Sequence, residues 1–187
     1  MQCGKTGGTG VGSYALVTYI PEPLGSFLDA LRRELVPNCL PRAHVTILPP
    51  RELPGSQDEA WNHIQAVVRD FPAFEVELTD LEVFDRTSVV YLALGKGLEE
   101  LRRLHDLLNR DAVAFQEPYA FEPHVTLAQD IQPEQVPEIR ERAARRWAEY
   151  GYRRVFPAEA ITFVRNVSDN RWADLARGTL NAVSLRR

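Results

Sequence analysis

Ala43-His44-Val45-Thr46-Ile47-Leu48 and Pro123-His124-Val125-Thr126-Leu127-Ala128 are two copies of one short phrase, and they decide how this sequence folds. Valine, threonine, isoleucine and leucine favour extended backbone, and a proline lies at or shortly before each copy. Both copies are therefore predicted to be β-strands. Side chains alternate between the faces of a strand, and residues two apart lie roughly 7 Å from each other on one face. Each copy should present its histidine and threonine together and turn its central valine toward a core.

Two such strands, side by side about a pseudo-twofold axis, would bring together His44, Thr46, His124 and Thr126. Imidazole has an unperturbed pKa of about 6.5, so a neutral ring can deprotonate an attacking water while a protonated ring supplies a leaving oxygen with its proton. Threonine hydroxyls can donate hydrogen bonds to non-bridging phosphate oxygens. A lone strand histidine more often has a structural role. Because two of the chain's 4 histidines share this context, we favour a paired site for phosphoester chemistry.

The repetition extends beyond the two motifs. Each is followed by a stretch of helical periodicity, an alternating apolar run, a turn and a further strand. The first copy places these at 56–70, 74–84, 85–87 and 89–94, and the second places them at 133–150, 155–164, 168–170 and from 172 onward. Further helices are predicted over 24–35 and 98–108, and a strand over 15–20. The expected fold class is α+β, with two pseudo-symmetric lobes of mainly antiparallel sheet and flanking helices around a central cleft.

Length and composition fit this architecture. A chain of 187 residues can bury the core of one domain, and 44% hydrophobic with 26% charged residues is the balance of a globular protein. The glycine-rich residues 1–13 are predicted to be a flexible N-terminal leader. Residues 14–187 are predicted to form a single bilobal domain.

The two His-Val-Thr-aliphatic motifs, their separation and the Pro-His-Val-Thr-Leu form of the second resemble the two-histidine phosphoesterase superfamily. The chain is most similar to the bacterial branch named 2'-5' RNA ligase or RNA 2',3'-cyclic phosphodiesterase, and the resemblance covers nearly all of it. The resemblance implies that His44 and His124 are the catalytic histidines. It also implies that Thr46 and Thr126 bind the phosphate.

Other residues near the motifs are weaker candidates. Members of the RNA ligase branch often have an arginine shortly after the second motif, where this chain has Gln129. Arg51, just after the first motif, could supply a cation instead, although a solvated loop arginine is the interpretation we favour. Tyr119 and Phe121 precede the second motif and are candidates for substrate binding by stacking on a nucleobase, with core packing as the alternative.

No metal or cofactor is predicted. His63 and His105 are expected on the surface faces of helices with structural or solvated roles, and no cluster with zinc spacing can be built from them and from Cys3 and Cys39. Two cysteines are too few for a disulfide framework, and the N-terminus lacks the apolar core of a signal peptide. A cytoplasmic location is therefore predicted.

Charge and hydropathy limit the partners. A net charge of −4 and a pI near 5.6 argue against sequence-independent binding of duplex nucleic acid, which needs a basic surface. No apolar run approaches the ~18–20 residues that span a bilayer, so no membrane partner is expected. The predicted partner is a cyclic-phosphate nucleotide or an RNA terminus. The protein itself is predicted to be a monomer.

The function that follows is a metal-independent phosphoesterase that opens 2',3'-cyclic phosphates on nucleotides or RNA ends to a phosphomonoester. The same geometry run backwards would give 2'-5' RNA ligase activity, and the sequence does not choose between the directions or between the roles of the two histidines. Hydrolysis of 2'-5' oligoadenylate or another small phosphodiester is an alternative. A non-catalytic module that binds nucleotides or RNA ends is another.

Overall fold

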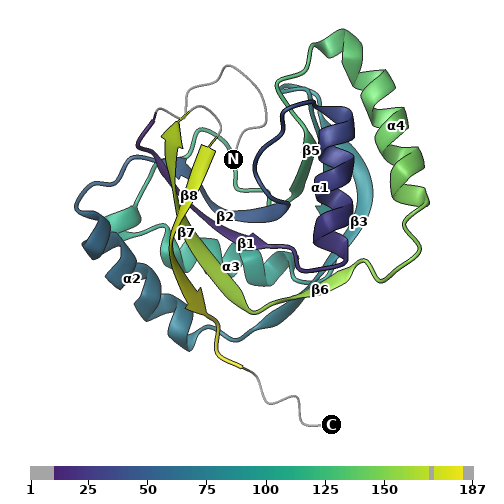
Figure 1. The fold of residues 1–187 in the computed structure, drawn as a ribbon. Helices are drawn as coiled ribbons and strands as arrows, with labels where there is room; N and C mark the ends of the chain where they lie inside the picture. Colours follow the sequence, from purple (N-terminus) through teal and green to yellow (C-terminus); the bar gives the residue numbers. More distant parts are fainter. Residues whose placement is uncertain (1–10, 169–170, 183–187) are drawn as a thin grey trace.

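Two four-stranded sheets form the centre of the protein (Figure 1). The computed structural model describes residues 11–168 and 171–182. The first sheet has the order β2-β1-β7-β8, with β2 at His44–Arg51, β1 at Tyr14–Tyr19, β7 at Ala160–Ser168 and β8 at Arg171–Thr179. The second has the order β5-β4-β3-β6, with β5 at Val125–Ala128, β4 at Val89–Leu94, β3 at Phe74–Phe84 and β6 at Val155–Ala158. All ladders between these strands are antiparallel, as predicted.

Four α-helices flank the sheets and match the predicted stretches closely. They are α1 (Leu24–Leu35), α2 (Gln57–Asp70), α3 (Leu98–Leu108) and α4 (Val136–Ala148), with short 3₁₀ turns at Asp111–Val113 and Pro133–Gln135. The helix α2 starts with a capping box in which the Ser56 hydroxyl accepts from the Glu59 backbone N–H at 3.2 Å. The Glu59 carboxylate accepts from the Ser56 backbone N–H at 2.8 Å. Two orphan donors of the first turn are thus satisfied. None of the helices in the described residues has the length and apolar character needed to cross a bilayer.

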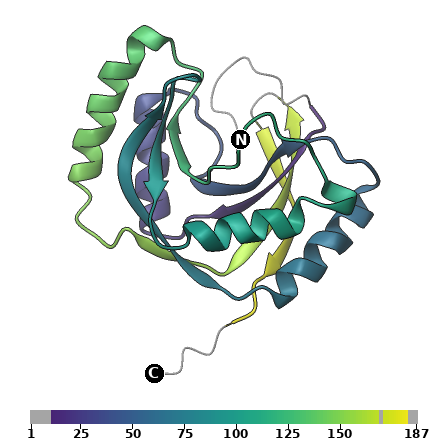
Figure 2. The same cartoon turned by 180° about the vertical axis from the view of Figure 1, so that it is seen from behind.

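The two halves of the chain exchange elements. Strand β3 follows the first motif but pairs with β4 in the second sheet, and β7 follows the second motif but pairs with β1 in the first sheet. The helices follow the same rule, because α1 contacts β5 and α3 contacts β2. Figure 2 shows α2 and α3 together in front of the strands, and α1 and α4 lie together at the left side of this view. The predicted pseudo-symmetric lobes are therefore interlocked.

The main core lies between the helices and the sheets and draws on all of them, with fully buried side chains such as Leu28, Ile47, Leu92 and Leu104. A second, smaller cluster lies on the other face of the first sheet. It consists of Ala15, Val17 and Val164, against which Tyr19 and Trp172 pack.

Two predicted elements differ from the structure. The single run expected over 155–164 is divided into β6 and β7, which belong to different sheets. The second motif's strand begins at Val125, so His124 lies immediately before it. The leader predicted for residues 1–13 lies mostly outside the described residues.

Candidate active site

The first motif lies at the start of β2, an edge strand whose position tolerates the two prolines near its end. His44 pairs in register with Tyr19 of β1, and Thr46 pairs with Val17. The Tyr19 and His44 rings are edge to face with centroids 6.4 Å apart. His44 and Thr46 therefore share the face of the first sheet that bears the small cluster, as strand alternation predicted.

The second motif is built in the same way on the second sheet. Thr126 pairs with Tyr91 of β4. The His124 ring lies edge to face with Tyr91 at 5.2 Å and with Phe84 at 5.1 Å, and the two aromatic rings stack on each other at 4.0 Å. His124 and Thr126 thus share one face.

The structure brings the two motifs toward each other. Strands β2 and β5 are the edge strands of their sheets, and they contact each other. The pKa of His44 is lowered well below its usual value, chiefly by burial, with smaller contributions from nearby positive charges that include Arg32 and His124.

Both imidazoles are held in the same tautomer. His44 Nδ1 lies 2.6 Å from the Arg42 carbonyl, and His124 Nδ1 lies 2.7 Å from the Glu122 carbonyl. A carbonyl only accepts, so in each ring Nδ1 carries the proton. Nε2 is left as the nitrogen that can exchange a proton with a ligand.

Burial keeps both rings neutral near pH 7. His44 is only 6% exposed, and His124 is half-buried. Burial disfavours the imidazolium form, and it lowers the pKa of His124 as well, although less than that of His44. The two motif histidines are thus similar in geometry but differ in their tendency to hold a proton.

Each histidine also has a tyrosine neighbour that the sequence had not singled out. The Tyr19 hydroxyl donates to Asp174 Oδ1 at 2.6 Å, and the Tyr91 hydroxyl donates to Glu82 Oε2 at 2.8 Å. Burial and the hydrogen bond to Asp174 raise the pKa of Tyr19 to about 12, and burial together with Glu82 raises that of Tyr91. Both phenols stay neutral donors. The sequence signal for them was a tyrosine on the strand that pairs with each motif.

Comparison with known proteins places this arrangement in a family. The model of the 2'-5' RNA ligase superfamily matches residues 20–170, which include both motifs. This chain belongs to the 2'-5' RNA ligase superfamily. The resemblance to two-histidine phosphoesterases is therefore confirmed.

Individual proteins are similar to this chain over much of its length. A Bacillus licheniformis protein, named provisionally as a phosphoesterase, is 25% identical over 130 residues, which cover 67% of this chain and 76% of that protein. The E. coli LigT structure complexed with 3'-AMP has a TM-score of 0.62 at 19% identity and covers 90% of this chain and 98% of LigT. The TT0787 protein of Thermus thermophilus has a TM-score of 0.64 at 17% identity and covers 90% of this chain and 97% of that one. These two solved structures have the same fold as this chain.

Arg51 is not the solvated loop residue that we expected. It ends β2, its side chain is 1% exposed, and its guanidinium donates to Glu117 at 2.7 Å and to Asn109 at 2.6 Å. It also donates to the Val113 carbonyl at 3.0 Å. Arg51 therefore ties the first motif's strand to the segment that leads into the second motif. Gln129, by contrast, is a neutral side chain that donates to Asp130.

His105, predicted on a surface face, is buried. Its Nε2 lies 2.9 Å from Glu117, and its ring stacks on Phe121 at 4.0 Å. Phe121 is thus engaged in packing beside this network, while Tyr119 is 61% exposed with the Arg86 guanidinium 5.8 Å from its ring. Their proposed contact with a nucleobase stays a prediction.

His63 is half-buried, and its Nε2 lies 3.2 Å from the Leu108 carbonyl, which fits the structural role expected for it. Within residues 11–168 and 171–182, no group of three or more histidine, cysteine, aspartate or glutamate side chains is arranged to hold a metal ion.

Proposed function

We propose that this protein is a metal-independent phosphoesterase that opens 2',3'-cyclic phosphates on nucleotides or RNA ends. One observation supports this most directly: two motif histidines whose Nδ1 atoms are both bound by the carbonyl two residues earlier. That bond presents Nε2 of each ring for proton transfer. Two such groups are what hydrolysis of an ester needs, one as base and one as acid.

We base the assignment of roles on the directions of the pKa shifts. Burial lowers the pKa of His44 further than that of His124, so we take His44 as the base, which must be neutral. Its Nε2 takes a proton from water as the water oxygen forms a bond to phosphorus. The bond from phosphorus to one ribose oxygen breaks, and His124, which enters this step as the imidazolium with protons on both nitrogens, donates its Nε2 proton to that oxygen. The product is a phosphomonoester, and the two rings then return to their starting states by exchange with solvent.

The two motif threonines complete the proposal. Thr46 and Thr126 lie on the same faces as the histidines and donate to the non-bridging phosphate oxygens, where negative charge is held in the transition state. The complexes of LigT with 3'-AMP and with phosphate support a nucleotide monophosphate as the product class. With a 5'-hydroxyl in place of water as the nucleophile, the same steps join that hydroxyl to the cyclic phosphate and give ligase activity.

The test is turnover of 2',3'-cyclic AMP and of a short RNA with a cyclic-phosphate end, with a chelator present throughout. The wild-type protein should be active, and His44→Ala and His124→Ala should each lower kcat at least ~10²-fold, because each removes one proton transfer. His63→Ala is the matched control, since this histidine binds a helix carbonyl, and it should retain activity.

Four results would contradict parts of this proposal. Loss of wild-type activity on chelation would refute a metal-free reaction. Full turnover by either motif variant would refute its catalytic role. Turnover of 2'-5' oligoadenylate but not of cyclic phosphates would favour the alternative substrate, and binding of cyclic AMP without turnover between pH 5 and 8 would favour a binding module.

A further inference from the structure

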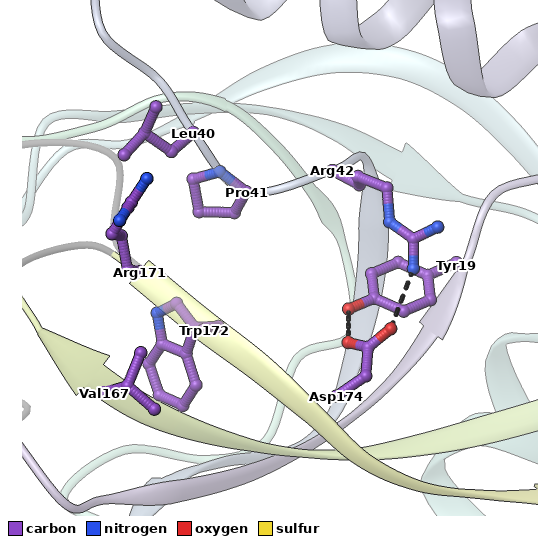
Figure 3. A pocket seen from close by; sticks show the side chains of 8 residues that line it. All are labelled: Tyr19, Leu40, Pro41, Arg42, Val167, Arg171, Trp172 and Asp174. Atoms are coloured by element: carbon purple, nitrogen blue, oxygen red, sulfur yellow. Dashed lines mark hydrogen bonds and ion pairs between the residues drawn. The ribbon is translucent and has the colours of Figure 1, made fainter.

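A pocket of about 640 Å³ lies beside the first motif (Figure 3). Its walls come from β1, from the segment just before β2, and from β7 and β8. Two lining residues are also neighbours of His44: the Tyr19 ring packs against the imidazole, and the Arg42 carbonyl accepts the hydrogen bond from Nδ1. The pocket is therefore lined by two residues that contact His44 directly.

One part of the pocket wall is apolar, formed by Leu40, Pro41, Val167 and Trp172. Trp172 of β8 is half-buried and packs on the small cluster that shares a face with His44. Leu40 and Val167, which are 58% and 50% exposed, are among the few large apolar side chains that the described surface leaves open to solvent. Apolar walls of this kind around a hollow of several hundred Å³ are typical of sites for small organic ligands.

One end of the pocket is polar and ordered. The Tyr19 hydroxyl and the Arg42 guanidinium both donate to Asp174, at 2.6 and 3.2 Å, and the guanidinium carbon lies 3.7 Å from the centre of the Tyr19 ring. The Arg42 and Asp174 side chains are 60% and 49% exposed, so their ion pair adds little to stability. Their remaining N–H groups and lone pairs are open to a ligand. Figure 3 shows Arg171 on the opposite side of the pocket from this trio.

We propose that this pocket binds the nucleobase of the substrate, with the base against Trp172 and its polar edge toward Arg42 and Asp174. A nucleobase is flat, has two π faces and carries donors and acceptors on its rim, so it matches an aromatic wall beside a charged end. A bare phosphate would use the cations but not Trp172, Leu40 or Val167. The proposal rests on the proposed function, because it assumes that the cyclic phosphate sits at the two histidines.

The first test compares two substrates in two variants. The substrates are 2',3'-cyclic AMP and the same cyclic phosphate on a ribose that has no base. Trp172→Leu should raise KM for cyclic AMP at least about five-fold, the loss expected for one stacking contact, and Trp172→Phe should restore most of it. The kcat/KM for the baseless substrate should stay unchanged in both variants. An equal loss on both substrates, or no loss on either, would overturn the proposal.

A second measurement does not depend on turnover. Calorimetric titration with 3'-AMP should show binding to the wild type and at least about five-fold weaker binding to Trp172→Leu, while the affinity for inorganic phosphate is the same in both. Trp61→Leu is the matched control, because Trp61 packs on Phe163 at the opposite face of the first sheet. It should bind 3'-AMP as the wild type does.

These measurements separate the two proposals. Weaker 3'-AMP binding by Trp172→Leu without any wild-type turnover of cyclic phosphates would refute the catalytic function and keep the base site. Equal 3'-AMP affinity in the wild type and in Trp172→Leu would refute the base site even if the enzyme is active. Failure of the wild type to bind 3'-AMP would refute it as well.

Discussion

At the scale of single residues, the two motif histidines differ from free histidine mainly through burial. Desolvation favours the neutral ring, and the hydrogen bond from Nδ1 to a carbonyl fixes where its one proton lies. The opposing backbone hydrogen bonds, which favour the charged form, do not overcome burial in either ring. Both rings therefore give up their extra proton below the usual pKa of about 6.5.

This pKa shift has a direct consequence for the pH profile. The base must be neutral and the acid must be protonated, so kcat/KM rises as pH passes the pKa of the base and falls as pH passes the pKa of the acid. Because both pKa values are lowered in the free protein, we expect kcat/KM for 2',3'-cyclic AMP to be greatest below pH 6.5. The measurement is kcat/KM from pH 4.5 to 8.5, with circular dichroism to verify folding at each pH. An optimum above pH 7 would contradict it.

Arg51 allows a prediction about stability. In Arg51→Met, the Glu117 side chain, which is 11% exposed, loses its guanidinium partner and keeps only His105, and a buried pair broken in this way typically costs about 3–5 kcal/mol. Urea unfolding should show a loss of this size. The double variant Arg51→Met/Glu117→Met should be more stable than the single one, since it also removes the buried carboxylate that has lost its guanidinium partner.

An exposed ion pair is the control for that experiment. Lys96 and Glu75 are 2.6 Å apart, with side chains that are 62% and 44% exposed. Lys96→Met should change the free energy of unfolding by less than about 1 kcal/mol. If Arg51→Met does no more than this control, the Arg51 pair has no special role in holding β2 to the segment before the second motif.

Sequence reasoning found the motif residues because strand alternation is local. His44 and Thr46 are two residues apart, so their shared face follows from the chain itself. The partners of Arg51 and Tyr19 are not local: Glu117 and Asp174 reach them only through the fold. An arginine after two prolines looks like a loop residue in sequence, and only the position of β2 against residues 109–117 makes it a buried cation.

At the scale of elements, the helices were the most predictable part. The capping box and the apolar stripe of α2 lie within 15 residues and need no tertiary information. The division between β6 and β7 was missed for the opposite reason. Residues 155–164 are continuously strand-like, yet the chain passes from the second sheet to the first within them, a change that depends on β3 and β1 as partners.

The cap of α2 gives a prediction at this scale. Ser56→Ala removes the hydroxyl that accepts from the Glu59 backbone N–H, and losing such a cap costs about 1 kcal/mol. In a protein of this size, that should lower Tm by roughly 2–4 °C. Calorimetry would measure it, and Ser56→Gly should lose only a few tenths of a kcal/mol. Equal Tm values for Ser56→Ala and the wild type would show that the box does not stabilise the folded state.

At the scale of the whole molecule, the exchange of elements decides how the site is held. Each sheet contains strands from both halves of the chain, and α1 and α3 each contact the motif strand of the opposite half. The two histidines therefore lie on sheets that each need strands from both halves of the chain. The sequence indicated two equivalent halves, but it could not indicate the exchange, because pairing within a half and pairing between halves leave the same local pattern.

Interlocked lobes should unfold together, and two tryptophans can report on them separately. Trp61 of α2 stacks near Phe163 of the first sheet at 6.2 Å, and the Trp147 indole of α4 donates to the Thr79 carbonyl of the second sheet at 3.0 Å. In variants that keep only one of these tryptophans, with the others changed to phenylalanine, we expect fluorescence and far-UV circular dichroism to give the same urea midpoint for each variant. The slopes m should also agree, because the same surface becomes exposed. If Trp147 reports a midpoint different from that given by circular dichroism in its own variant, the second lobe unfolds separately and the exchanged strands do not couple the two halves of the site.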